Sequence, residues 1–387
     1  MYDVVCFSHL RWNFVFQRPQ HLMTRCARRH RTVFVEEPVW ADKPSGLDKS
    51  RDASGVEVWV PHLDPMDPRE PEVVQAELLA SAFAEERLER ALFWYFTPAA
   101  IAFSRELPRR AVVYDAMDEL SAFKDAPRSL IAFERELLRE ADLVFTGGRS
   151  IYEAKRELHP SVHAFPSGVD VAHFARARES QPDPEDQAAI PHPRLGFFGV
   201  IDERLDIELL AKVAAKQPDW HFVLLGPVVK ISPTSLPQAR NLHYLGPKTY
   251  EELPSYLSGW DVCLLPFARN EATRFISPTK TPEYLSALKP VVSTSIRDVV
   301  TPYGERGFVR IADSPDDFVE ACRASMQPPV ESWQSEVQRF LAASSWDRTW
   351  TEMERLMDTA MARHGEPASR SVVSARNEEQ AQRAVGK

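Results

Sequence analysis

SPTKTPEYLSALKPVVST, residues 277–294, has the pattern of a short helix that begins near Lys280 and leads into an apolar strand. Residues three apart are neighbours on a helix surface, so Lys280 and Glu283 are expected to share one side of the first turn. A helix start presents unpaired N–H groups and the positive end of the helix dipole, which favour phosphate. The stretch predicts an α/β unit with a candidate anion site. An ordinary exposed ion pair is the alternative for the two charged residues.

The same alternation of apolar strands and helices runs through both halves of the chain. Continuous apolar strands separated by helices indicate parallel sheets covered on both faces. The sequence therefore predicts an α/β protein with two Rossmann-like, doubly wound parallel-sheet domains and a cleft between them. The expected strands cover residues 4–9, 32–37, 56–61, 91–96, 111–116, 142–147, 194–199, 220–226, 241–246, 260–267, 289–294 and 308–313.

Composition shifts suggest where the domains end. Residues 175–193 are rich in proline and charge and poor in large apolar side chains, which is typical of a linker. Residues 344–364 have the pattern of an amphipathic helix, which we expect to cross back onto the first domain. The expected divisions are a first domain at 1–175, a linker at 176–193, a second domain at 194–343, a C-terminal helix at 344–365 and a disordered tail at 366–387.

Charge and cysteine content narrow the functional class. The chain has 387 residues and a formal net charge of −9, which argues against a general nucleic-acid binder. Its four cysteines are far apart and lack metal-binding spacing, as in a reduced cytoplasmic protein. No apolar run is long enough to span a bilayer. The arginine cluster Arg25, Arg28, Arg29 and Arg31 leaves open a peripheral contact with the inner face of a membrane, and a solvated helix face is the commoner explanation.

Ligands on open parallel sheets bind beyond the carboxyl ends of the strands. Three expected strands of the second half end in glycine, at Gly199, Gly226 and Gly246. Glycine lets the backbone approach a ligand closely, so a nucleotide site is credible there, although tight turns explain the same glycines. Neither a P-loop nor the G-x-G-x-x-G fingerprint is present.

Several segments resemble a known family. LGFFGVIDERLD, NLHYLGPKTYEELPSYLSGWDVCLLPF and SPTKTPEYLSALKPVVST in the second half resemble the nucleotide-sugar domain of GT-B glycosyltransferases. FSHLRWNFVFQRPQHLM, ALFWYFTP and VVYDAMDELSAF are similar to the acceptor half of a bacterial branch that includes teichuronic-acid and exopolysaccharide transferases. The resemblance covers roughly residues 1–360. It identifies the chain as a member of the group 1 glycosyltransferase superfamily.

The resemblance implies a donor site in the second half. The glutamate at the position of Glu283 accepts hydrogen bonds from the ribose hydroxyls, and Lys280 neutralises the diphosphate beside it. Arg204 is a second candidate for the diphosphate, and pairing with its acidic neighbours is the alternative. The turn after the strand at 241–246 is expected to meet the nucleobase, through Gly246 and Lys248.

Catalytic candidates follow the strand at 111–116. Asp118 is the first choice for a general base and Asp115 the second, while capping of the next helix is the alternative for both. Retaining relatives carry a glutamate eight residues before the position of Glu283, where this chain has Phe275. The resemblance therefore leaves a retaining or an inverting outcome open. His9, Trp12 and His21 are candidates for acceptor binding, and a structural role in the core is the alternative for each.

These observations predict a glycosyltransferase that uses a nucleotide-diphosphate sugar and a glycan or lipid-linked acceptor in cell-surface polysaccharide synthesis. The scheme requires no cofactor and no metal, because Lys280, Arg204 and the helix dipole can hold the diphosphate. A sugar-nucleotide epimerase on the same fold is one alternative. A catalytically silent sugar-nucleotide or glycan-binding protein is another.

Overall fold

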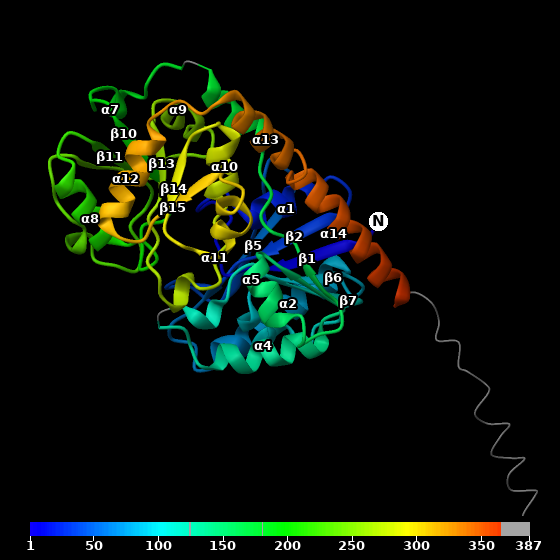
Figure 1. The fold of residues 1–387 in the computed structure, drawn as a ribbon. Helices are drawn as coiled ribbons and strands as arrows, with labels where there is room; N and C mark the ends of the chain where they lie inside the picture. The colour runs from blue at the N-terminus through cyan, green and yellow to red at the C-terminus, as the bar shows by residue number, and fades with distance from the viewer. Residues whose placement is uncertain (124, 180, 365–387) are drawn as a thin grey trace, which may run out of the picture.

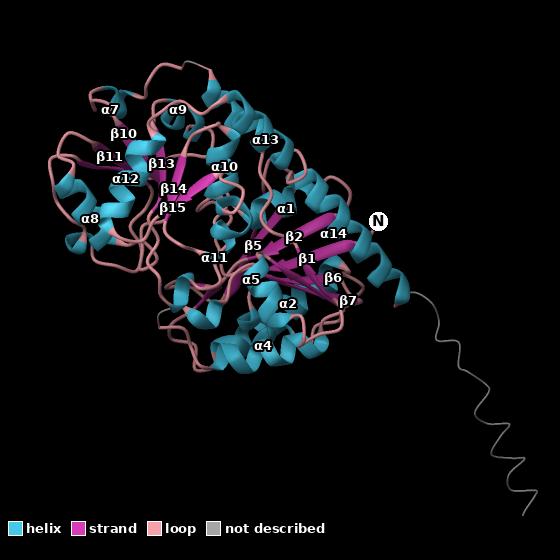
Figure 2. Ribbon diagram, in the orientation of Figure 1, coloured by secondary structure: helices cyan, strands magenta, loops and turns pink. Residues whose placement is uncertain are grey.

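Two parallel sheets, one in each half of the chain, carry the helices on their faces (Figures 1 and 2). The computed structural model describes residues 1–123, 125–179 and 181–364. The predicted fold class, two doubly wound α/β units, is confirmed. The tail expected at 366–387 lies outside the described residues.

The first sheet has nine strands in the order β3-β5-β2-β1-β6-β7-β8-β9, and β4 pairs antiparallel with β5. All other pairs in this sheet are parallel. The strands are β1 (Asp3–Phe7), β2 (Arg31–Val35), β3 (Val39–Trp40), β4 (Gly46–Arg51), β5 (Glu57–Leu63), β6 (Leu92–Tyr95), β7 (Ala111–Ala116), β8 (Leu143–Thr146) and β9 (Val162–Ala164).

The second sheet has six parallel strands in the order β12-β11-β10-β13-β14-β15. In both sheets the central strands are continuous runs of buried residues, because helices cover both faces. The strands are β10 (Arg194–Phe198), β11 (His221–Leu225), β12 (Leu242–Gly246), β13 (Val262–Leu265), β14 (Val291–Ser293) and β15 (Val309–Ile311).

The helices begin and end at recognisable signals. For example, α2 begins at Pro71, and its last turn closes on Arg87 in the left-handed conformation. The helices are α1 (Arg18–Cys26), α2 (Pro71–Glu86), α3 (Ile101–Ser104), α4 (Ser129–Glu140), α5 (Arg149–Lys155), α6 (Val171–Ala175), α7 (Glu185–Ala188), α8 (Ile207–Lys216), α9 (Leu253–Ser258), α10 (Lys280–Ser286), α11 (Arg297–Val299), α12 (Pro315–Ser325), α13 (Glu331–Leu341) and α14 (Trp346–Arg363).

Helix α14, orange to red in Figure 1, leaves the second half of the chain and lies along α1 and the first sheet. Trp346 is 2% exposed and stacks on His21 with ring centroids 4.7 Å apart. Trp350, Met353 and Met357 are buried in the same apolar cluster. These contacts attach the C-terminal helix to the first half.

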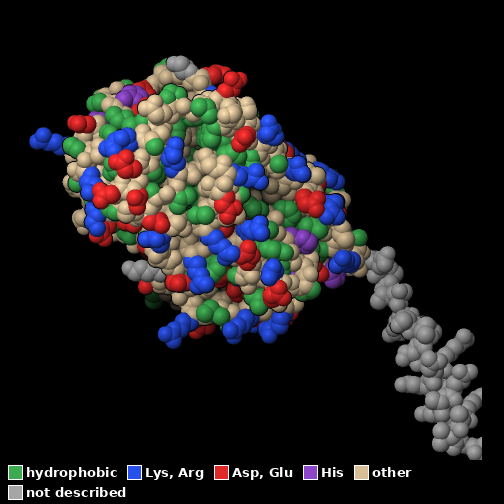
Figure 3. All heavy atoms as spheres, in the orientation of Figure 1, with side chains coloured by type: hydrophobic (Ala, Val, Ile, Leu, Met, Phe, Trp, Pro, Cys, Tyr) green, Lys and Arg blue, Asp and Glu red, His purple; other side chains and the backbone are tan. Residues whose placement is uncertain are grey.

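The basic cluster on and after α1 faces carboxylates. Arg25 and Arg28 both meet Asp347 of α14, at 2.8 and 3.4 Å, and Arg29 meets Glu354 at 2.7 Å. The fourth arginine of the cluster pairs with carboxylates beside β2, at Glu57 and Glu86. Arg25, Arg28 and Arg29 thus help to hold α14. The sequence interpretation as a lipid-facing or solvated helix face had missed these contacts. Figure 3 shows acidic and basic side chains interspersed on the face in view.

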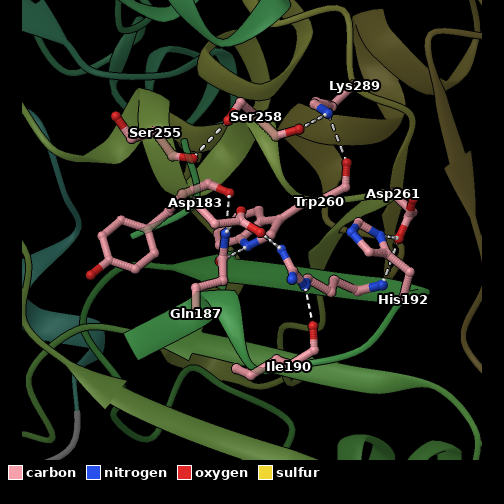
Figure 4. Close-up of polar contacts among 11 residues, drawn as sticks. Asp183, Gln187, Ile190, His192, Ser255, Ser258, Trp260, Asp261 and Lys289 are labelled. Atoms are coloured by element: carbon pink, nitrogen blue, oxygen red, sulfur yellow. Dashed lines mark hydrogen bonds and ion pairs between the residues drawn. The ribbon is translucent and has the colours of Figure 1, made fainter. Parts of the chain in front are cut away.

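The segment expected to be a linker is attached to the second sheet's layer (Figure 4). Gln187 is buried, accepts a hydrogen bond of 2.8 Å from the Trp260 indole N–H, and donates one of 3.1 Å to the Tyr256 carbonyl. Arg194 pairs with Asp183 at 2.8 Å. The composition of the segment resembles that of a flexible connector, but these polar contacts fix it in place.

No helix in the described part of the chain is both long and apolar enough to cross a membrane.

Candidate active site

A cavity of about 450 Å³ lies between the two sheets. It is lined by residues that follow β1 and β7 in the first sheet and β10, β11, β12 and β13 in the second, together with the start of α10. The carboxyl ends of both sheets therefore face one space, which is where open parallel sheets bind ligands. Of the predicted site residues, the cavity wall includes Asp118, Gly199, Arg204, Lys248, Lys280 and Glu283.

Lys280 and Glu283 lie one turn apart on α10 and both line the cavity. Burial lowers the pKa of Lys280, and the charge of Glu283 acts in the opposite direction. Burial raises the pKa of Glu283 to about 7, opposed by the charge of Lys280. Among the described residues neither side chain makes a hydrogen bond or an ion pair. Charged groups in this position are stabilised when a ligand supplies partners of opposite charge or hydrogen-bonding groups.

Two glycines shape the wall opposite Lys280. Gly199 follows β10 with a φ of +142°, and a Cβ atom there would lie 2.0 Å from Cε of Lys280. Gly226 follows β11 with the same φ, and a Cβ atom there would lie 1.9 Å from the Gly199 carbonyl oxygen. Any side chain at Gly199 would therefore displace Lys280. The sequence analysis singled out these strand-end glycines as places of close ligand approach, but it did not predict the contact between Gly199 and Lys280.

Arg204 enters the cavity from the loop after β10, held by one carboxylate. Its Nε donates to both oxygens of Asp202 at 3.0 Å, and its Nη2 donates to Oδ2 at 2.6 Å. The guanidinium also lies over the Phe123 ring, 5.5 Å from its centroid. Arg204 thus pairs with its acidic neighbour, as the alternative expected, and it also lines the cavity.

The two candidate bases have different surroundings. Asp118 lies two residues past the end of β7 and lines the cavity. Asp115 lies within β7, is fully buried, and receives hydrogen bonds of 2.9 to 3.1 Å from Arg18. Asp115 does not line the cavity, and its carboxylate is committed to this buried ion pair.

The three acceptor candidates lie away from the cavity wall. Trp12 is 6% exposed and packs edge-on against Phe34 in the core. His21 stacks on Trp346, and burial lowers its pKa to about 3, so the ring is neutral. Burial also lowers the pKa of His9. The core alternative describes the positions of Trp12 and His21. His9 is half-buried, and its Nδ1 atom is buried with no hydrogen-bond partner among the described residues.

The turn after β12 contributes part of the wall. Gly246 has a φ of +72° but does not line the cavity, whereas the next residues, Pro247 and Lys248, do. The Lys248 ammonium pairs with Asp186 of α7 at 2.6 Å, so this lysine also ties the 176–193 segment to the site.

An aromatic contact between the two halves was missed at the sequence level. Tyr250 lines the cavity, and its ring lies 4.9 Å from that of Phe16, which comes from the loop after β1. On its other side Tyr250 stacks on His173 at 4.1 Å. Burial raises the pKa of Tyr250, and the charge of Glu283 acts in the same direction. In the sequence, Tyr250 could have been noticed because it follows Gly246 by four residues, in the turn that was expected to meet the nucleobase.

Residues 192–327 match the family model described as glycosyl transferases group 1. TuaH of Bacillus subtilis (strain 168), whose name describes a glycosyltransferase of teichuronic acid biosynthesis, is 27% identical over 277 residues. That alignment covers 66% of this chain and 68% of TuaH.

The fold is similar to that of solved GT-B enzymes. Sucrose-phosphate synthase from Thermosynechococcus elongatus superposes with a TM-score of 0.69 at 13% identity, covering 94% of this chain and 100% of that one. An E. coli trehalose-6-phosphate structure bound with UDP-2-fluoro glucose has a TM-score of 0.68 at 11% identity, over 93% and 99% of the two chains. Anabaena HepE, in complex with UDP and glucose, has a TM-score of 0.65 at 12% identity, over 92% and 100%.

Proposed function

The chain is a glycosyltransferase of group 1 with the GT-B fold, and on this premise we propose that it moves a sugar from a nucleoside diphosphate to a glycan or lipid-linked acceptor. The relationship to TuaH supports a role in cell-surface polysaccharide synthesis. Structural neighbours that hold UDP or a UDP-sugar support a nucleotide donor.

The observation that carries the donor proposal is the pair of ionisable side chains Lys280 and Glu283 on one cavity wall, both without protein partners among the described residues. The ammonium neutralises the diphosphate, which gains negative charge as the glycosidic bond breaks. The carboxylate accepts hydrogen bonds from the two vicinal ribose hydroxyls. Arg204, already oriented by Asp202, adds a second cation beside the leaving group.

Helix α10 has only seven residues, so its dipole is a weaker contribution than these side chains. The nucleobase lies toward Pro247, Lys248 and Tyr250, the part of the wall that follows β12. This assignment orients the nucleotide along the second sheet and points the sugar toward Asp118.

Asp118 acts as general base in this scheme. An inverting transfer needs a group that removes the proton from the acceptor hydroxyl, and a carboxylate within hydrogen-bond reach serves this purpose. Asp118 lines the cavity from the first sheet, opposite the donor-binding wall.

A panel of nucleotide sugars, incubated with the purified protein and with glycan or lipid-linked acceptors, tests the proposal. Transfer to an acceptor, with release of the nucleoside diphosphate, is the expected result. Interconversion of the donor sugar without an acceptor would instead support an epimerase. Binding without turnover under all conditions would support a catalytically silent protein.

A further inference from the structure

Helices α5 and α11, one from each half of the chain, lie side by side (Figure 1). Asp298 of α11 is 5% exposed, and its carboxylate accepts hydrogen bonds from the backbone N–H groups of Arg149 and Ser150, at 2.8 and 3.1 Å. Burial raises the pKa of this carboxyl group, and its hydrogen bonds, including one from Ser277, act in the opposite direction. A buried carboxylate of the second half therefore has hydrogen-bond donors from both halves.

Gly148, the residue before α5, has no room for a side chain. A Cβ atom there would lie 2.3 Å from Oδ2 of Asp298 and 2.7 Å from the Cβ atom of Ser277. Its φ of −158° and ψ of 168° are extended backbone, which any residue adopts, so the second half alone sets this restriction. Ser277 also lines the donor cavity. The backbone of the first half therefore touches the second half directly behind the cavity wall.

Phe275 belongs to the same contact. Its carbonyl accepts a hydrogen bond of 3.2 Å from the Ser150 hydroxyl. Its side chain packs against the apolar cluster of the first half, which includes Val144 of β8 and Ile151 of α5. The first half thus holds both the carbonyl and the side chain of this second-half residue.

Residues 275–279, here called the donor loop, connect this contact to the donor cavity. Residues 276–279 line the cavity and lead directly into Lys280, the first residue of α10. The hydrogen bond from the Ile276 N–H back to the Thr273 carbonyl is 3.4 Å long, and a bond of this length is weak. The position of the loop, and with it the start of α10, therefore depends on its contacts with Asp298 and the first half.

We propose that Gly148, Ser150 and Asp298 are positioning residues that hold the donor loop in the arrangement that binds the nucleotide. The inference rests on the proposed glycosyltransferase function, because the loop carries the donor-binding lysine. When the contact is weakened, the loop populates other arrangements. The nucleotide then binds only the fraction of molecules that has the right one, so its apparent affinity falls by that fraction.

Hydrogen exchange on the full chain without nucleotide, followed by mass spectrometry, tests the contact itself. Ser150→Ala removes the hydroxyl group that binds Phe275, and Gly148→Ala places a methyl group between the two halves. Amides of residues 275–283 should exchange about 2- to 10-fold faster in Ser150→Ala, and at least as fast in Gly148→Ala, as expected for loss of one hydrogen bond. Exchange in β7 and β10 should keep wild-type rates, which a globally destabilised variant would not show.

Isothermal titration calorimetry with UDP and GDP tests the consequence for the donor. Both variants should bind nucleotide in a one-to-one complex with a Kd about 2- to 10-fold above that of the wild type. A variant that is only partly folded would instead bind less nucleotide per chain with the wild-type Kd. The stoichiometry therefore separates a positioning role from a structural one.

Arg297→Met is the matched control. Arg297 of α11 pairs with Glu153 of α5 at an exposed position, so this pair joins the same two helices without involving the donor loop. Exposed ion pairs contribute little, and this variant should keep wild-type exchange at residues 275–283 and wild-type nucleotide affinity. If the wild type binds neither nucleotide, the donor proposal fails, while hydrogen exchange still shows whether the first half holds the loop. Wild-type exchange at residues 275–283 in both Gly148→Ala and Ser150→Ala, or wild-type nucleotide affinity of both, overturns the inference.

Discussion

Replacing Lys280 with methionine separates a donor-binding lysine from a structural one. Methionine keeps the side chain as far as Cε, the atom nearest Gly199, so the space there stays filled while the ammonium is removed. Lys280 makes no ion pair among the described residues, and burial lowers its pKa, which means that the folded protein disfavours its charge. The variant should therefore unfold at the same temperature as the wild type or at a higher one.

Nucleotide binding should change in the opposite direction. A hydrogen bond to a charged group contributes about 1.5–3 kcal/mol, which corresponds to roughly a 10- to 150-fold loss of affinity for UDP or GDP. Isothermal titration calorimetry measures this loss, and differential scanning calorimetry measures the unfolding temperature of the unliganded protein.

Lys289→Met is the matched control. Lys289 donates to the carbonyls of Ser258 and Trp260 at 2.9 and 2.8 Å (Figure 4), so its loss should destabilise the fold and leave nucleotide affinity intact. Unchanged affinity of Lys280→Met for both nucleotides, or a lowered unfolding temperature like that of Lys289→Met, would refute the reasoning.

Three further predictions concern the cavity and the two candidate bases. Gly199→Ala should lower both the unfolding temperature and UDP affinity, because its Cβ would lie 2.0 Å from Cε of Lys280; normal UDP binding in a calorimetric titration would contradict this. Asp118→Asn should lower kcat by about 100-fold or more and leave UDP affinity unchanged; full transfer activity of this variant would exclude Asp118 as the base. Asp115→Asn should instead lower the free energy of unfolding in urea by about 3–5 kcal/mol, because it leaves a buried arginine unpaired. Burial raises the pKa of Glu283 from 4.5 to about 7, so between these pH values the folded state holds a proton that the unfolded state has released. The free energy of unfolding should therefore fall as pH rises from about 4.5 to 7. Glu283→Gln should lack this part of the fall, and identical pH profiles of unfolding temperature for the variant and the wild type would contradict the prediction.

Central strands such as β7, β10 and β13 were recovered because they are buried on both faces and therefore largely apolar. β4, Gly46–Arg51, escaped prediction because it is a polar, largely exposed edge strand with no apolar alternation. β3 and β9 are only two and three residues long and carry no detectable period. Pattern reading thus finds the apolar strands, including the edge strands β12 and β15 of the second sheet, and misses the polar or very short strands of the first sheet.

The site was predictable where its parts are close in sequence. Lys280 and Glu283 share one helical turn, so their proximity follows from helix geometry alone. The contact between Phe16 and Tyr250 joins the two halves of the chain, and no local pattern encodes it. The same holds for the arginines near α1, whose partners on α14 are more than 300 residues away.

Asp115 and Asp118 show a different limit. Both follow the apolar start of the same strand, and no local pattern indicates that Arg18 pairs with the first of them. Distinguishing a buried ion pair from a free carboxylate requires the position of the partner, which comes from another part of the chain.

A crystal structure of the protein with bound UDP tests the central claim most directly. The account predicts the diphosphate within hydrogen-bond distance of Lys280 Nζ and the ribose hydroxyls at the Glu283 carboxylate. Nucleotide bound away from α10, or bound there with neither side chain in contact, would contradict it.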